Sequence, residues 1–154
     1  GERMKAVIQR VLSASVTADG EPAGKIGKGL LVLLGVTEED TEKEAELLAS
    51  KVSSIRIFTD DEDKMNLSVS DVKGNILVVS NFTLCADSKK GNRPSFSSAM
   101  EPQTANELYE KFCRFISARH IDVKKGVFGA DMQISMVADG PVTIILDTDI
   151  WSKK

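Results

Sequence analysis

Two stretches of the sequence combine residue types that could do chemistry, and the first is a sharp break near the C-terminus. Ala138-Asp139-Gly140-Pro141-Val142-Thr143 separates two apolar runs, 132–137 and 142–146, that alternate or branch at Cβ as strands do. An Asp-Gly pair favours a hairpin, but Pro141 has no N–H to give to a ladder, so the turn is not an ordinary one. If the Gly-Pro bond is cis, the carbonyls of Gly140 and Pro141 can point the same way into a cavity. A simple β-turn is the alternative.

The second stretch ends a long strand that we expect over 76–84. The end of this strand carries the hydroxyls of Ser80 and Thr83 around Phe82. The segment that follows, 89–94, is broken by glycine and contains the densest group of cations in the chain. A positive loop beside hydroxyls suits a phosphate-bearing ligand, and a solvated lysine turn is the alternative.

Metal and thiol chemistry have little support in the sequence. Four carboxylates follow one another over 60–63, but they lack the alternate spacing and the glycine of a calcium loop, so we expect a solvated turn. Cys85, Cys113 and His120 are too few to form a zinc site from the usual ligands. Nothing near them supports a Cys–His hydrolase. We therefore expect no metal and no cofactor.

The composition predicts one globular domain. The chain has 154 residues, of which 42% are hydrophobic and 28% are charged, enough for a single substantial core. We expect this domain to span 4–150 and interpret residues 1–3 as a remnant of cloning. No apolar run approaches the ~20 residues of a membrane span and no leader is apparent, so we expect a cytoplasmic protein. Because the formal charge is −3, an RNA partner must be met by a local basic patch.

Strands and two helices are predicted from periodicity and capping signals. We interpret residues 5–17 as two strands that form a hairpin. A capping box at 41–44 starts a helix that packs on a sheet. Pro102 and a second capping box, at 104–107, start another helix, which His120 ends. These elements together predict an α/β fold.

Several motifs in order carry a resemblance to a known family. They are Gln9-Arg10-Val11, Ser80-Asn81-Phe82-Thr83-Leu84, Lys90-Gly91-Asn92-Arg93-Pro94-Ser95-Phe96, Phe128-Gly129-Ala130-Asp131-Met132-Gln133 and Asp139-Gly140-Pro141-Val142-Thr143. With these motifs the chain resembles the D-aminoacyl-tRNA deacylase family from Met4 nearly to the C-terminus. Two positions depart from the family pattern. Asn81 stands where the family usually has Gln, and Ala138 stands where it usually has Asn.

The resemblance implies a mixed α/β fold, a single compact domain of mostly antiparallel β-sheets packed with two main α-helices. It implies a homodimer in which the Gly-cis-Pro turn of one subunit enters the active site of the other. The substrate would be a tRNA that carries a D-amino acid on its terminal adenosine, and the reaction would be hydrolysis of that ester.

The resemblance also implies roles for individual residues. The catalytic segment comprises Ser80, Asn81, Phe82 and Thr83. Substrate binding and rejection of L-amino acids involve Met132, Gln133, Gly140 and Pro141. Arg10 orients the turn. With tRNA as the substrate, we expect Lys89, Lys90 and Arg93 of the basic loop to contact its backbone.

Such a site would select D- over L-amino acids by steric clash. If the carbonyls of Gly140 and Pro141 bind the substrate ammonium, the side chain points outward in one configuration of the α-carbon. In the other configuration it clashes with the turn. We therefore expect activity on many D-amino acids and on glycine.

Two mechanisms are open, and two other functions compete with the deacylase. Thr83 could be the nucleophile, but no obvious base accompanies it. We favour a water aligned by the ribose hydroxyl, with backbone N–H groups near Phe82 and Thr83 stabilising the oxyanion. The rival functions are a non-catalytic tRNA-binding module and a hydrolase of free D-amino-acid esters.

Overall fold

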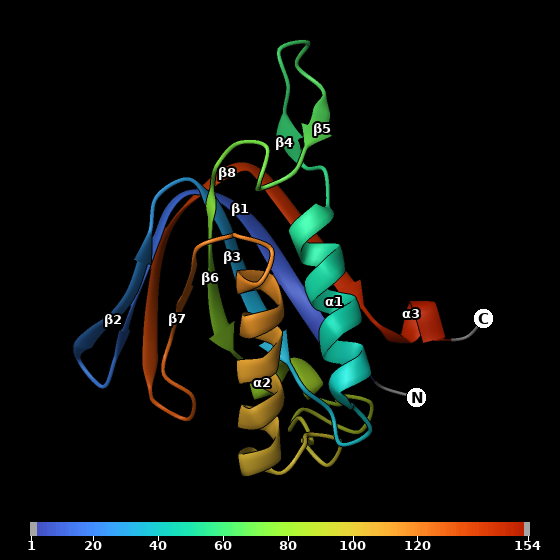
Figure 1. The fold of residues 1–154 in the computed structure, drawn as a ribbon. Helices are drawn as coiled ribbons and strands as arrows, with labels where there is room; N and C mark the ends of the chain where they lie inside the picture. Colours follow the sequence, from blue (N-terminus) through green and yellow to red (C-terminus); the bar gives the residue numbers. More distant parts are fainter. Residues whose placement is uncertain (1–2, 153–154) are drawn as a thin grey trace.

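The computed structural model describes residues 3–152, so Gly1 and Glu2 of the expected cloning remnant lie outside the described part. One curved sheet of six strands carries two long helices on one face (Figure 1). Its strands are β1 Lys5–Ala18, β2 Glu21–Ile26, β3 Gly29–Gly35, β6 Asn75–Ser80, β7 Val123–Lys125 and β8 Met132–Asp147. A separate hairpin consists of β4 Phe58–Thr59 and β5 Met65–Leu67. The α-helices are α1 Glu42–Ser54, α2 Pro102–Ser117 and α3 Asp149–Ser152.

The sheet is mostly antiparallel, as predicted, but it contains two parallel pairs. The strand order is β2-β1-β3-β6-β7, and β8 pairs with β1. β1 is antiparallel to β2, β3 and β8, whereas β3 with β6 and β6 with β7 are parallel. Parallel neighbours need crossover connections, and α1 and α2 lie in these two crossovers. The predicted mixed α/β class with two main helices is confirmed.

β1 is one strand of 14 residues, so the prediction of two strands within 5–17 is wrong. The hairpin lies instead between β1 and β2, around Asp19 and Gly20, whose φ values of 48° and 84° suit a tight turn. A shift of register near the middle of β1 reverses the side of the sheet that its side chains face. Ile8 therefore packs in the core beneath the helices, while Ala14 packs in a second cluster on the other face.

Both predicted helices are present, but the start of α2 differs from the prediction. The capping box at 41–44 starts α1 as expected. α2 begins at Pro102, but the box predicted at 104–107 is wrong, because the N-cap is Glu101, whose carboxylate accepts hydrogen bonds from the first N–H groups of the helix. His120 lies beyond the end of α2, in a turn with a φ of 64°, so it does not end the helix.

β8 is also a single strand, so the break at 138–143 does not separate two strands. It is a large β-bulge, in which the four residues 139–142 stand opposite Arg10 alone. The long strand bends sharply at the top of Figure 1, where this bulge interrupts its pairing with β1.

Candidate active site

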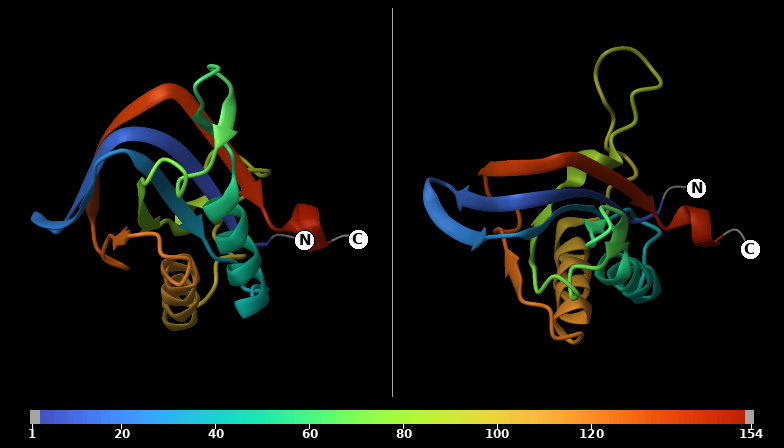
Figure 2. Two further views of the ribbon diagram at one scale, coloured as in Figure 1. Left: turned by 45° about the horizontal axis from the view of Figure 1, so that its top comes forward. Right: turned by 90° about the horizontal axis from the view of Figure 1, so that it is seen from above.

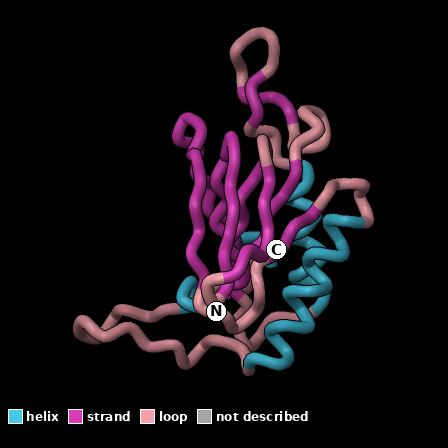
Figure 3. The backbone as a smooth tube through the Cα atoms, turned by 90° about the vertical axis from the view of Figure 1, so that its left-hand side faces the viewer, coloured by secondary structure: helices cyan, strands magenta, loops and turns pink. Residues whose placement is uncertain are grey.

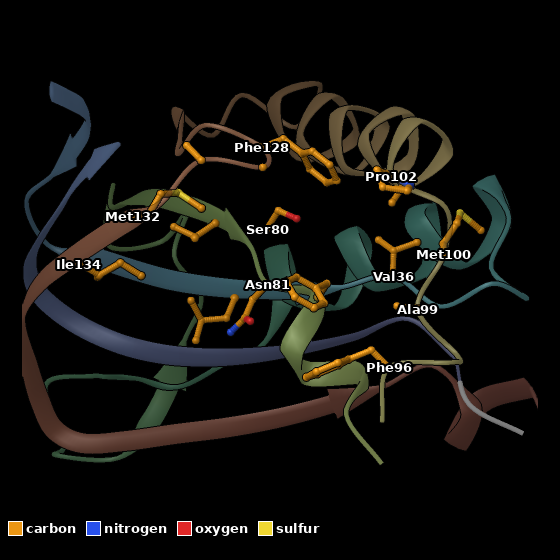
Figure 4. A pocket seen from close by; sticks show the side chains of 16 residues that line it. Val36, Ser80, Asn81, Phe96, Ala99, Met100, Pro102, Phe128, Met132 and Ile134 are labelled. Atoms are coloured by element: carbon orange, nitrogen blue, oxygen red, sulfur yellow. The ribbon is translucent and has the colours of Figure 1, made fainter. Parts of the chain in front are cut away.

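A cavity of about 680 Å³ lies at the C-terminal end of β6 (Figure 4). Its walls come from η1 Phe82–Cys85, a short 3-10 helix that follows β6, from the start of α2 and from the first residues of β8. Most of the lining is apolar and includes Val36, Phe96, Met100, Phe128 and Ile134. An apolar cavity with a few polar groups at one edge is typical of a site for a small molecule or for one end of a larger one.

Asn81 turns the chain from β6 into η1, so the strand predicted over 76–84 ends at Ser80. The side-chain oxygen of Asn81 accepts a hydrogen bond from the Thr83 N–H at 3.2 Å and another from the Thr83 hydroxyl. This is the bonding of an N-cap, for which Asn is well suited. The Phe82 N–H has no hydrogen-bond acceptor among the described residues, as is usual at the start of a helix. A main-chain N–H at the edge of a pocket can stabilise an oxyanion.

The site lacks the partners that an attacking side chain needs. The Thr83 hydroxyl is exposed and bonds to Asn81, and within residues 3–152 no histidine, lysine or carboxylate bonds to it. Cys85 and Cys113 are both buried. Burial raises the pKa of the Cys113 thiol to about 12, so it is protonated at neutral pH. The geometry therefore favours attack by a positioned water.

The pocket brings together four of the residues that the sequence predicted for the site. Ser80, Asn81 and Phe82 line the pocket where β6 leads into η1, and Met132 lines it from β8. Figure 4 labels Ser80, Asn81 and Met132. Gln133 is not among the described residues that line the pocket of its own chain, since neighbouring residues of a strand point to opposite faces.

The turn lies apart from the pocket of its own chain. The Gly140–Pro141 peptide bond is cis, as the resemblance implied, and neither residue is among the described residues that line the cavity. Along β1 the turn stands opposite Arg10, Ser80 aligns with Ala6 through β3, and Ile134 of the pocket pairs with Val16.

Arg10 ties the turn to the neighbouring β4–β5 hairpin. Its buried guanidinium donates from Nε to the Asp139 carbonyl at 3.3 Å and pairs with the Asp139 carboxylate at 3.2 Å. Nη1 donates to the Ile57 carbonyl at 2.7 Å. A planar guanidinium has enough donors to hold both segments at once, which an ammonium group would do less rigidly.

The basic loop leaves one end of the sheet and extends toward the side away from the two long helices (Figures 2 and 3). It leaves and returns through a clasp of two backbone hydrogen bonds between Asp87 and Ser95, at 2.7 and 2.8 Å. All three predicted cations, Lys89, Lys90 and Arg93, are exposed beyond this clasp and form no ion pair with the described residues.

Sequence reasoning missed two phenylalanines of the pocket. The ring of Phe96 packs edge-on against Phe82, with centroids 5.1 Å apart and planes at 65°. Phe128 lies across the pocket from Phe96 (Figure 4) and contacts Tyr109 at 6.1 Å between centroids. Both stand within the motifs that carried the resemblance, but each comes from a loop, where no periodic pattern indicates which side chains turn inward.

Comparison with known proteins agrees with the motifs. The family model described as D-Tyr-tRNA(Tyr) deacylase matches residues 7–147. A D-aminoacyl-tRNA deacylase from Anaeromyxobacter dehalogenans is 53% identical over 145 residues, which are 94% of this chain and 97% of the relative. One from Pelobacter propionicus is 54% identical over 144 residues, 94% and 99% of the two chains. A solved structure titled c-Myc DNA Unwinding Element Binding Protein has a TM-score of 0.86 and 44% identity, and covers 92% of this chain and 97% of its own.

By these matches the chain is a hydrolase that acts on carboxylic ester bonds. Within that class, it belongs to the D-Tyr-tRNA(Tyr) deacylase family, which confirms the resemblance. Between residues 3 and 152 no helix is long and apolar enough to cross a membrane. In the same part of the chain, no group of three or more His, Cys, Asp or Glu side chains could hold a metal ion.

Proposed function

We propose that this protein hydrolyses the ester between a D-amino acid, or glycine, and the terminal adenosine of tRNA. The observation that carries the proposal is the apolar pocket beside η1, where the Phe82 N–H has no acceptor among the described residues. Relatives at 53% and 54% identity are named D-aminoacyl-tRNA deacylases. An activated ester needs less help than an amide, so positioning and oxyanion stabilisation can suffice. We place the protein in the cytoplasm, where this substrate is met.

The active unit in this proposal is a homodimer in which the turn of each subunit enters the pocket of the other. Two-fold symmetry makes the exchange reciprocal. In support, Gly140 and Pro141 do not line the pocket of their own chain within the described residues. Apolar side chains of β1 and β8 are also exposed in the single chain: Leu12 by 54%, Val137 by 52% and Ile145 by 68%. A second copy that covers these side chains would remove exposed apolar surface.

The turn would then select the hand of the substrate. The carbonyls of Gly140 and Pro141 accept hydrogen bonds from the substrate ammonium, which fixes the α-carbon. An L side chain is directed into the turn, whereas a D side chain or the hydrogen of glycine is not. Arg10, through its bonds to Asp139, keeps the turn in place. Selection by collision needs no recognition of any particular side chain.

The chemical step needs only a water molecule, the ribose hydroxyl of the substrate and the Phe82 N–H. The ribose hydroxyl next to the ester aligns a water, whose oxygen attacks the carbonyl carbon. The carbonyl oxygen becomes an oxyanion that accepts a hydrogen bond from the Phe82 N–H. The bond to the ribose oxygen breaks, and this oxygen takes up one proton of the attacking water. The carboxylic acid that forms releases the other proton to solvent, so the amino acid leaves as a free carboxylate.

A first experiment compares ester loss from D-tyrosyl-, L-tyrosyl- and glycyl-tRNA in parallel at one salt concentration. We expect rapid loss of the D-tyrosyl and glycyl esters while the L-tyrosyl ester is spared. Resistance of glycyl-tRNA, with D-tyrosyl-tRNA cleaved, would contradict selection by collision. Binding of all three without cleavage would instead support the alternative function, a non-catalytic tRNA-binding module.

Thr83→Ala should lose activity only modestly and remain a working enzyme. Its hydroxyl bonds to Asn81 and only supports η1, so we expect kcat to fall by about 2- to 10-fold, the effect of one lost hydrogen bond. Single-turnover deacylation of D-tyrosyl-tRNA measures this, with Thr83→Ser as the control that keeps the hydroxyl. If Thr83→Ala is inert while its fold and tRNA binding persist and Thr83→Ser is active, then Thr83 is the nucleophile.

The basic loop is proposed to contact tRNA phosphates. Replacing Lys89, Lys90 and Arg93 together with alanine should raise KM for D-tyrosyl-tRNA and reduce the salt slope of binding by about 2 to 3. D-tyrosyl-adenosine, which has no phosphate, should be cleaved as fast as by the unmodified protein. Lys43→Ala, which removes an exposed cation from α1, is the control. An unchanged salt slope in the triple variant would exclude the loop from tRNA binding.

A further inference from the structure

Phe96 joins the basic loop to the pocket. It follows Ser95, whose backbone closes the clasp with Asp87 at 2.7 and 2.8 Å. The Phe96 ring lies 5.1 Å from that of Phe82, edge against face, and both rings border the cavity. The exposed fractions are 36% for Phe96 and 58% for Phe82, so the pair lies at the open side of the pocket.

The return arm of the loop is anchored on η1 as well as on the clasp. The Ser98 hydroxyl donates to the Cys85 carbonyl at 3.2 Å, and the Ser98 carbonyl accepts a hydrogen bond from the Glu38 N–H at 2.9 Å. Phe96 therefore stands between two fixed points. A ring held in this way can restrain a second ring, because an aromatic pair in edge-to-face contact gains stabilising free energy beyond that of the area it buries.

Phe82 lies between two residues whose hydrogen bonds fix the backbone, whereas its ring is the more exposed of the pair. The Asn81 N–H donates to the Leu34 carbonyl at 2.8 Å, and on the C-terminal side Thr83 bonds to Asn81. The Phe82 N–H belongs to the same residue, so motion of the ring is transmitted to the donor that the reaction uses. We propose that Phe96 is a positioning residue that acts through Phe82 to hold this N–H in place. The inference rests on the proposed deacylation.

The effect belongs to the chemical step and not to tRNA binding. Phe96 lies on the pocket side of the clasp, whereas the three cations lie beyond it. Phe96→Ala should therefore lower kcat by about 3- to 10-fold with KM little changed. The same fall is expected with D-tyrosyl-adenosine, which cannot bind the loop through phosphate. Phe96→Tyr keeps the ring and should restore kcat, while Phe96→Leu, which fills similar space without a ring, should not.

The test is a double-mutant cycle on kcat with Phe96→Ala, Phe82→Ala and the double variant. If Phe96 acts through Phe82, the double variant is no slower than Phe82→Ala alone, whereas independent roles multiply the two losses and overturn the inference. Leu47→Ala on α1, exposed by 38%, controls for loss of a half-exposed apolar side chain. Urea unfolding confirms that each variant is folded.

The two failures are distinguishable in the same experiment. If the unmodified protein cleaves no D-aminoacyl ester, the proposed function is wrong and the inference falls with it. If the unmodified protein cleaves D-tyrosyl-tRNA and folded Phe96→Ala has the same kcat, or a raised KM alone, only the role of Phe96 is overturned.

Discussion

Gly140→Ala is expected to lower kcat/KM for D-tyrosyl-tRNA by about 100-fold. The φ of Gly140 is +121°, which L side chains rarely adopt, and an added Cβ would lie 2.9 Å from Val142 Cγ2 and 3.2 Å from Arg10 Nη2. Relief of these contacts requires movement of the backbone or of both the Val142 and Arg10 side chains. The carbonyls that we propose for the substrate ammonium would move with the backbone, and misplacement by about 1 Å is enough for a loss of this size. Initial rates of D-tyrosine release measure the effect.

Gly27→Ala provides the matched control. Nothing lies within 4 Å of a Cβ built on Gly27, so this variant should keep kcat/KM close to that of the unmodified protein. Urea unfolding of both variants separates loss of activity from loss of fold. A folded Gly140→Ala with unchanged kcat/KM would mean that the turn takes no part in binding the substrate.

Features encoded in consecutive residues were predictable. The capping box at 41–44 needs only Thr41 and Glu44 in the right order, and it is present in the structure. β3 and β6 are buried on both faces, and this is why their apolar runs are continuous instead of alternating. Motifs spread along the chain predicted the family, because each preserves a short local pattern.

Features that depend on partners far along the chain were not predictable. The register shift in β1 is defined only by pairing with β8, so residues 5–17 could not indicate that one strand serves two cores. The N-cap of α2 was misplaced because Thr104 fits a capping box as well as Glu101 fits an N-cap, and only geometry decides between them. The contact of Phe96 with Phe82 follows from the path of a loop, which has no periodicity.

The separation of turn and pocket is the least predictable feature of the site. Both groups of residues were assigned to one active site through resemblance, yet in the single chain Gly140 and Pro141 are not among the described residues that line the pocket. No local pattern in a sequence states that a site is completed by a second copy. Exposed apolar side chains such as Ile145, which is 68% exposed although its strand is paired there, indicate it only once the fold is known.

Mixing two inactive variants is expected to restore about a quarter of the activity of the unmodified protein. Gly140→Leu disables the turn, and Ala99→Trp fills the pocket, which Ala99 lines. After unfolding and joint refolding at equal concentrations, half of the dimers contain one subunit of each kind. In such a dimer one site combines an intact pocket with the intact turn of the other subunit, and the second site carries both defects. Deacylation of D-tyrosyl-tRNA by the mixture measures the recovery.

A second mixture distinguishes a turn that acts in the pocket of the other subunit from a turn that acts in the pocket of its own subunit. Here both substitutions are placed in one chain, which is refolded with an equal amount of unmodified protein. If the turn acts on the other subunit, mixed dimers are inactive, and the mixture keeps about a quarter of the activity of an equal amount of fully unmodified dimers. If the turn acts within its own chain, each mixed dimer keeps one working site and the mixture keeps about half. No recovery in the first mixture together with one half in the second would refute the shared site, and Gly140 would then have to reach the pocket of its own subunit by a rearrangement of β8.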